Sequence, residues 1–159
     1  GDPSLAPRLL DVHRRIGVPL FREGTNLVDL TAVENVALAA RLALEHANAH
    51  GQAYNITNGD PRPFRELLDR LLTLVGETPR YRRVSIRVLY PLAAVLEKLY
   101  AVLPGYPEPP LTRYTLTTIA YSQTLDISRA RADLGYVPRV SLDDALAAFA
   151  ATRATRRGH

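Results

Sequence analysis

The sequence TLDISRARADLGYVPRVS, at residues 124–141, is the most informative part of the chain about its fold. It opens with a short extended run, after which Ser128 is placed as a helix N-cap whose hydroxyl would accept a backbone N–H from the first turn. Gly135 can take the left-handed conformation that closes a short helix. Ser141 and Asp144, three residues apart, then predict the capped start of a final helix. Each part of the stretch can serve the architecture alone.

The order Asp-x-Ser-Arg-Ala-x-x-x-Leu-Gly-Tyr-x-Pro over residues 126–138, followed by a Ser/Asp-capped helix, resembles the end of an extended short-chain dehydrogenase/reductase. That family includes nucleotide-sugar epimerases and dehydratases and the bacterial 3β-hydroxysteroid dehydrogenase-like enzymes. The similarity covers the chain to about Ala150. Its other pieces, in chain order, are GDP at 1–3, NLVD at 26–29, VENV at 33–36, QAYNITN at 52–58 and EPPLTR at 108–113.

The resemblance implies an α/β fold, namely the C-terminal, substrate-binding part of an extended Rossmann-type fold, helix-rich and with short strands. The N-terminal dinucleotide-binding half of such enzymes is absent from these 159 residues. We expect residues 1–152 to form the substrate-binding part and residues 153–159 to form a basic, disordered tail.

Composition excludes several classes of protein. Apolar residues make up 47% of the chain, which suits a globular domain with a core, and the absence of cysteine excludes disulfides and thiol chemistry. His46 and His50 have metal-ligand spacing but flank Asn48 at the end of a predicted helix, so we expect no metal site. No apolar run is long enough to span a bilayer and no signal peptide opens the chain, so a cytoplasmic location is expected.

The net charge of +4 comes almost entirely from arginine, since Lys98 is the only lysine. Arg80, Arg82 and Arg83 surround Tyr81 and could be interpreted as a nucleic-acid patch. An exposed strand with a basic edge explains them as well, and no recognition-helix or RNA-binding motif accompanies them. We therefore expect no nucleic-acid partner.

Hydrophobic periodicity predicts the remaining elements. Thr31 and Glu34 predict a capping box for a helix of about sixteen residues. Its inward face would consist of Val33, Val36, Ala40, Ala43, Leu44 and Ala47. The other predictions are helices at 5–15, 63–75 and 112–121, strands at 18–21, 27–30, 53–57 and 80–86, a turn at 23–26, and a stiff connector at 104–110.

Residues 88–103 are strongly apolar, interrupted only by the pair Glu97 and Lys98. Pro91 predicts the first turn of a helix or a kink. A buried or lid helix is the first interpretation. The alternative is a helix that lies against lipid or a greasy substrate, so that peripheral membrane contact stays open.

The chain lacks the motifs that carry chemistry in this family. No glycine pair has the spacing that brings backbone up to a pyrophosphate, and no Ser/His/Asp arrangement is present. A Tyr-x-x-x-Lys pair that used Lys98 would need tyrosine at position 94, which is Ala94. We therefore expect no catalytic, cofactor-binding or metal-ligating residue in this chain, and no cofactor bound by the chain alone. Whether the chain is itself an enzyme stays open.

Two departures from the family pattern bear on the substrate. Nucleotide-sugar members usually place an arginine on the substrate diphosphate just before the residue that matches Asp29, where this chain has Val28. Valine cannot make that bidentate contact. Ala32 also stands where the family often has histidine or tyrosine. Both differences, together with the apolar segment 88–103, favour a hydrophobic substrate.

The resemblance thus implies part of an NAD- or NADP-dependent oxidoreductase that interconverts a secondary alcohol and a ketone on a steroid-like or 3-oxoacyl substrate. Its expected partner is the missing N-terminal Rossmann half, on the same or another chain, and a homodimer is compatible with it. The alternatives are the C-terminal region of a nucleotide-sugar epimerase or dehydratase, and a stand-alone, non-catalytic binding module. The residues predicted to bind substrate are Phe21, Asn26, Val28, Arg113 and Tyr114.

Overall fold

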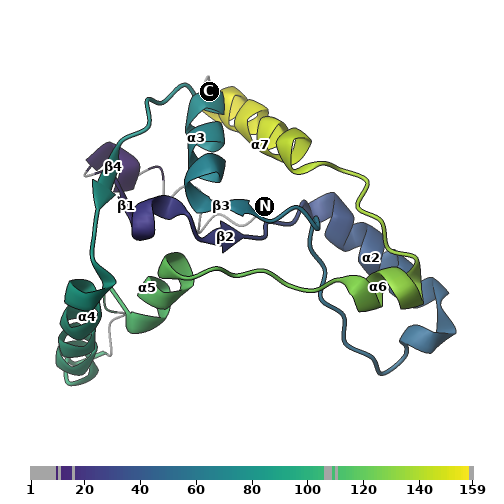
Figure 1. The fold of residues 1–159 in the computed structure, drawn as a ribbon, viewed down its shortest axis with the longest axis horizontal. Helices are drawn as coiled ribbons and strands as arrows, with labels where there is room; N and C mark the ends of the chain where they lie inside the picture. Colours follow the sequence, from purple (N-terminus) through teal and green to yellow (C-terminus); the bar gives the residue numbers. More distant parts are fainter. Residues whose placement is uncertain (1–9, 11, 16, 106–108, 110, 158–159) are drawn as a thin grey trace. The chain divides into compact units, whose positions relative to one another are not determined.

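A computed structural model describes residues 10, 12–15, 17–105, 109 and 111–157 of the chain; at 153–157 it describes the backbone only (Figure 1). These residues form two compact units. One unit contains Leu27–Pro79 and the chain from Gln123 onward, and the other contains the residues up to Asn26 together with Arg80–Ser122. The helix-rich α/β character with few short strands is confirmed. Among the described residues, no helix combines the length and apolarity that a membrane crossing requires.

The smaller unit is built on two parallel strands that are far apart in sequence. Val18 lies opposite Tyr81 in the register, and Leu20 lies opposite Arg83. The elements of this unit are β1 (Val18–Leu20), the 3-10 helix η1 (Arg22–Gly24), β4 (Tyr81–Arg83), α4 (Ile86–Ala101) and α5 (Arg113–Ala120).

The helix predicted at 5–15 is confirmed over its described part, since residues 12–15 are helical. It ends at Gly17, whose φ of 81° lies in the left-handed region and whose N–H donates to the His13 carbonyl at 3.0 Å. A Cβ at Gly17 would meet the Arg80 carbonyl oxygen at 3.0 Å, so this turn requires glycine twice over. The rest of this predicted helix, apart from Leu10, lies outside the described residues.

The helix α4 corrects the prediction of a buried helix at 88–103. Among the described residues of α4, only Ala93 is fully buried. Ile86 and Leu89 pack with it against the cluster formed by Phe21, Leu116 and Ala120. The other side of the helix exposes Val88, Leu92, Val95 and Leu99. Pro91 lies inside the helix rather than in its first turn.

The larger unit contains most of the helices. A short antiparallel pair places Leu27 opposite Pro63, and Gln123 bridges to Val28 in parallel on the other side. The elements are β2 (Leu27–Val28), α2 (Val33–Glu45), the 3-10 helix η2 (Ala47–Ala49), β3 (Arg62–Pro63), α3 (Phe64–Leu74), α6 (Ser128–Leu134) and α7 (Leu142–Arg157).

The stretch 124–141 folds largely as predicted, with one change at its cap. The N-cap residue of α6 is Ile127 rather than the predicted Ser128, and no side chain caps the helix. The Ser128 N–H and hydroxyl both donate to the Asp126 carboxylate, at 2.8 Å and 2.5 Å. Gly135 ends α6 with a φ of 62°. The Ser141 hydroxyl accepts the N–H of Asp144 at 3.1 Å, which confirms the cap of α7.

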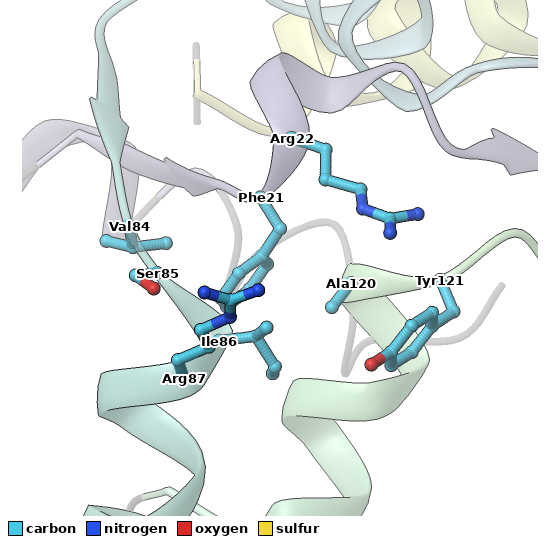
Figure 2. Close-up of a pocket in the computed structure, with 8 residues that line it drawn as sticks. All are labelled: Phe21, Arg22, Val84, Ser85, Ile86, Arg87, Ala120 and Tyr121. Carbon is cyan, nitrogen blue, oxygen red and sulfur yellow. The ribbon is translucent and has the colours of Figure 1, made fainter.

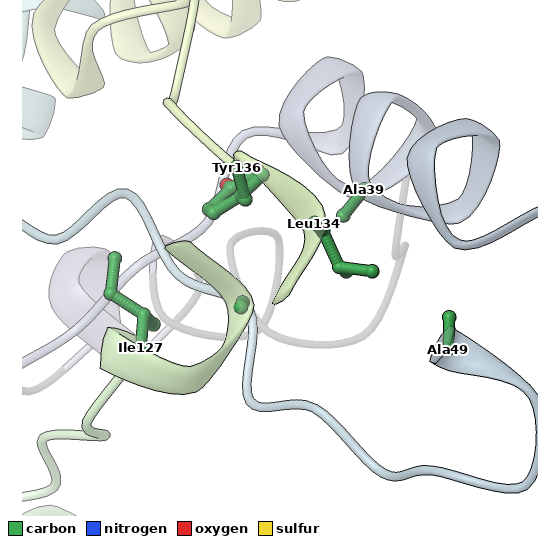
Figure 3. Packing of buried hydrophobic residues seen from close by; sticks show 6 residues of the cluster. Ala39, Ala49, Ile127, Leu134 and Tyr136 are labelled. Carbon is green, nitrogen blue, oxygen red and sulfur yellow. The ribbon is translucent and has the colours of Figure 1, made fainter. Parts of the chain in front are cut away.

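The core of this unit surrounds α6. Ile127, Leu134 and Tyr136 form one cluster with Ala39 of α2 and Ala49 of η2 (Figure 3). Tyr54 and Ile56 are partly buried and pack against this cluster. The helix predicted at 63–75 is also confirmed as α3, whose side chains Leu67, Leu68, Leu71 and Leu72 are buried.

The helix α2 differs from its prediction in both cap and face. No side chain caps it through Thr31, whose hydroxyl donates instead to the Ile56 carbonyl at 3.3 Å. The residues fully buried on α2 are Asn35 and Ala39, so the predicted inward face was wrong. Of that face, Val33, Val36 and Leu44 are exposed, with Leu44 at 84%.

The strand predicted at 53–57 is absent, because no backbone ladder forms along it. Instead of a partner strand, side chains of the same unit form hydrogen bonds at this segment and just after it. The Asn58 amide oxygen accepts the Ala32 N–H at 2.9 Å and the Asn35 amide at 2.9 Å. The Tyr136 hydroxyl donates to the Thr57 carbonyl at 2.9 Å. These bonds hold the segment without a second strand.

Candidate substrate-binding site

A hollow of about 300 Å³ opens in the smaller unit. Three segments line it: residues 21–22 after β1, residues 84–87 where β4 leads into α4, and residues 120–121 at the end of α5. Figure 2 shows the Phe21 ring between the second and third of these segments. The parallel pairing of β1 with β4 brings the first two together, since the Val84 N–H also donates to the Leu20 carbonyl at 3.1 Å.

One part of this hollow is apolar. Phe21 is only 3% exposed and packs in the same cluster as Ala120. Val84 and Ile86 are half-buried members of that cluster. A ligand in the hollow would therefore meet carbon surface that the core already holds in place.

The other part is polar and basic. Arg22 and Arg87 line the hollow with Ser85 and Tyr121, and no acidic side chain does. In the part of the chain that the structure describes, neither guanidinium is held in an ion pair. Unpaired arginines of this kind suit an anionic group, because the guanidinium presents several N–H donors in one plane.

The backbone beside the hollow adopts a rare conformation. Arg22 and Glu23 have φ values of 47° and 61°, in the left-handed region that non-glycine residues seldom occupy. The turn is held by the Gly24 N–H, which donates to the Phe21 carbonyl at 2.8 Å, and by the Thr25 hydroxyl, which donates to the Arg22 carbonyl at 3.0 Å. Such conformations cost on the order of 1–3 kcal/mol each and concentrate at ligand sites.

The structure brings Phe21, among the residues predicted to bind substrate, to this hollow. Asn26 lies in the same unit but does not line the hollow. Its amide donates to the Ile119 carbonyl at 3.1 Å, it is 6% exposed, and its amide oxygen has no hydrogen-bond partner among the described residues.

Arg113 and Tyr114 lie at the start of α5. The Arg113 side chain and backbone N–H both donate to the Glu97 carboxylate at 2.7 Å, and the guanidinium lies 5.9 Å from the centre of the Tyr90 ring. The backbone bond, followed by the side-chain bond, lowers the pKa of Glu97 below its usual value. Arg113 thus ties α5 to α4. Tyr114 is 79% exposed.

Val28 belongs to the larger unit, in β2. Its neighbour Asp29 ties that strand in place: the Asp29 N–H donates to the Gln123 carbonyl at 3.1 Å, and its carboxylate accepts the Leu125 N–H at 3.4 Å. Asp29 therefore contributes to the architecture of this unit.

Sequence reasoning missed four polar residues of the hollow, Arg22, Ser85, Arg87 and Tyr121. Their sequence neighbourhoods carry no motif, and their proximity depends on a strand pairing that spans more than sixty residues. The charge of Arg22 and Arg87, next to predicted strand ends, was the only available signal.

The described residues do not fit a dinucleotide. Binding a pyrophosphate needs a glycine-rich turn between a strand and a helix, so that backbone N–H groups can approach it. Here β3 passes directly into α3 without a glycine, and α4 follows β4 through Val84 and Ser85. Within the described ranges, no group of three or more potential metal ligands gathers either. No chemical step is therefore assigned to a cofactor held by these residues.

Comparison with curated proteins gives close relatives over almost the whole chain. The chain is 38% identical over 158 residues to 2-alkyl-3-oxoalkanoate reductase of Stenotrophomonas maltophilia (strain K279a). This alignment covers 97% of the chain and 48% of the reductase. The chain is 35% identical over 153 residues to the decarboxylating sterol-4-alpha-carboxylate 3-dehydrogenase of Mus musculus, covering 91% of this chain and 42% of that enzyme. No family model matches the chain.

The chain belongs to the extended short-chain dehydrogenase/reductase superfamily. Its match within the superfamily is to the 3β-hydroxysteroid dehydrogenase-like branch, as the sequence motifs predicted. The chain spans about half the length of the curated relatives it matches.

Solved structures of the superfamily share the fold of this chain. The Y149F mutant of UDP-glucuronic acid 4-epimerase from Bacillus cereus, in complex with a fluorinated UDP-sugar and NAD, aligns with a TM-score of 0.60 at 20% identity. The alignment covers 94% of this chain and 39% of that chain. Other solved structures with this fold were determined with NAD or NADPH.

Proposed function

We propose that this chain supplies the substrate-binding part of an NAD(P)-dependent oxidoreductase that interconverts a ketone and a secondary alcohol on a hydrophobic substrate. The observation that carries the proposal is the 38% identity to a 3-oxoalkanoate reductase across 97% of the chain. A nicotinamide would supply or accept the hydride. It would be held, with the Tyr/Lys catalytic pair, by residues other than these 159, in the cytoplasm, where reduced nicotinamide is available.

The proposed substrate class is inferred from the names of the two relatives described above. One name specifies a 3-oxoalkanoate with a substituent at carbon 2, and the other a 4-carboxylate with reaction at carbon 3. In both, a carboxylate is attached to the carbon next to the reacting one. We therefore propose a 3-oxo or 3-hydroxy carboxylic acid with a large apolar body as the substrate of the intact enzyme.

Exposed apolar side chains on α4 support a hydrophobic ligand or partner. Val88, Leu92, Val95 and Leu99 follow one another at steps of three and four along α4, so they form one stripe. Monomeric proteins seldom expose such stripes without a use. The stripe supports an apolar substrate body, and peripheral contact with lipid is its alternative.

A second exposed surface supports an N-terminal half as partner. Val33, Val36 and Leu44 of α2 are exposed, and the nearby segment 52–58 has the alternating sequence of a strand but no strand partner. An N-terminal half would cover the exposed side chains of α2 and would pair with segment 52–58 as a strand. A homodimer stays a prediction.

Of the residues predicted to bind substrate, the proposal assigns Phe21 to the wall of the hollow. Asn26, Val28, Arg113 and Tyr114 stay predictions. The nucleotide-sugar alternative keeps some support, because two arginines that line one hollow, Arg22 and Arg87, also suit a diphosphate. Val28, at the position where nucleotide-sugar enzymes use arginine, counts against it.

A thermal-shift experiment on the complete gene product separates these functions. We expect NADPH or NADH together with 3-hydroxydecanoate to raise the melting temperature more than either nicotinamide alone. Protection by UDP-glucuronic acid, with none by the hydroxy acid, would favour the nucleotide-sugar function. A protein that melts cooperatively and responds to no nicotinamide would favour the non-catalytic binding module.

A further inference from the structure

The hollow in the smaller unit combines the two properties that an amphiphilic acid requires. Arg22 and Arg87 supply positive charge, with Ser85 and Tyr121 as neutral hydrogen-bonding groups. The Phe21 ring lies among them (Figure 2). A fully polar anion would gain nothing from that ring, and an uncharged apolar ligand would leave the arginines without a partner.

The start of α4 adds to the positive character of the polar part. Ser85 is the N-cap residue of this helix, and its side chain makes no capping hydrogen bond. The first N–H groups of any helix lack acceptors within it, and they carry partial positive charge. The Ser85 hydroxyl is thus free to bond to a ligand held by Arg87, two residues further on.

The size of the hollow favours a small anionic group over a large one. Its volume of about 300 Å³ lies at the lower limit of sites that hold whole drug-sized molecules, roughly 300–1,000 Å³. A carboxylate and the first carbons attached to it fit this space. A nucleoside diphosphate with its sugar would need considerably more.

We infer that Arg22 and Arg87 bind the carboxylate of the substrate, and that Phe21, Val84 and Ile86 pack against the carbon chain beside it. This inference rests on the proposed function for the identity of the acid. The strained turn at Arg22 then has a purpose, since it fixes the start of that long side chain beside the β4–α4 junction. The two arginines are binding residues and make no contribution to hydride transfer itself.

The test measures binding by isothermal titration calorimetry on the complete gene product. The probe is 3-hydroxydecanoate, and its uncharged methyl ester is the matched control ligand. The variants are Arg22→Gln and Arg87→Gln. Arg82→Gln is the matched control variant, because Arg82 is an exposed arginine of β4 that does not line the hollow.

We expect each of the two variants to weaken binding of the acid about tenfold or more, since each removes charge-assisted hydrogen bonds. Binding of the ester should change little, and Arg82→Gln should bind both ligands as the unaltered protein does. Arg87→Lys, which keeps the charge but loses the planar fork, should give an intermediate loss. Equal far-ultraviolet circular dichroism confirms that the variants fold.

Acid binding that survives both substitutions would overturn the inference, as would equal affinity for acid and ester. Tighter, arginine-dependent binding of UDP-glucuronic acid would also overturn it in favour of a diphosphate site. The proposed function fails separately: arginine-dependent binding of the acid, in a protein that does not oxidise NADPH or NADH with a 3-oxo acid, would leave the carboxylate site standing without the reductase.

Discussion

Replacing Asn35 by alanine should destabilise the larger unit strongly. This side chain is fully buried, and all of its hydrogen-bonding capacity is used. Its amide oxygen accepts the backbone N–H groups of Arg139 at 2.9 Å and Val140 at 3.1 Å. Its amide nitrogen donates to Asn58 at 2.9 Å and to the Val140 carbonyl at 2.8 Å. One residue thereby fixes α2 to the chain that precedes α7.

The magnitude follows from which groups keep a partner in Asn35→Ala. The Val140 carbonyl still accepts from the Asn58 amide at 3.0 Å, and the Asn58 oxygen still accepts the Ala32 N–H at 2.9 Å. The N–H groups of residues 139 and 140 lose the acceptor that they have among the described residues. At about 1–3 kcal/mol for each orphaned group, the substitution should cost roughly 2–6 kcal/mol.

Urea unfolding of the complete gene product, followed by circular dichroism, measures this cost. The matched control is Arg41→Ala on the same helix, which removes only an exposed ion pair with Glu45 at 3.2 Å. Such pairs contribute about 0.3–0.5 kcal/mol. If the free energy of unfolding of Asn35→Ala lies within about 1 kcal/mol of that of the unaltered protein, like that of the control, the Asn35 hydrogen bonds do not fix the chain before α7. That result would refute the prediction.

Three further substitutions test the same unit. Gly135→Ala should cost about 1 kcal/mol in urea unfolding, because alanine tolerates the φ of 62° poorly, and a stability equal to that of the unaltered protein would contradict this. Tyr136→Phe removes the bond to the Thr57 carbonyl at 2.9 Å and should cost about 1–3 kcal/mol, since it leaves a buried carbonyl with one bond fewer. Hydrogen bonding by Arg62 lowers the pKa of Asp143, so this carboxylate stabilises the fold above its unfolded pKa and stops doing so as pH falls through the lower, folded pKa. Asp143→Asn should therefore be less stable than the unaltered protein at pH 7 and equally stable in strong acid, and a pH-independent difference would exclude the pairing.

Local signals in the sequence were sufficient where the bonds are local. Gly135 and the Ser141–Asp144 cap were predicted because each acts within three or four residues. The helix α3 was predictable from the helical spacing of four leucines, which are all buried in the structure. The family was predictable from the motif at 126–138, and the 38% identity to a reductase supports this family assignment.

Predictions failed where distant groups decide. A strand at 53–57 needs a neighbour, and the neighbours here are the side chains of Thr31 and Tyr136. The buried face of α2 is set by Asn35, a polar residue that hydrophobic periodicity ignores. Of the residues that line the hollow, the sequence pointed to Phe21 alone, because β1 and β4 meet across more than sixty residues.

We propose that this chain works in a reductase of 3-oxo carboxylic acids. The most direct measurement is the loss of NADPH or NADH absorbance when the complete gene product meets a freshly prepared 2-alkyl-3-oxoalkanoate. We expect nicotinamide oxidation that depends on the acid and is much slower with the corresponding methyl ester. No oxidation with the acid, together with conversion of UDP-glucuronic acid to its 4-epimer, would contradict it.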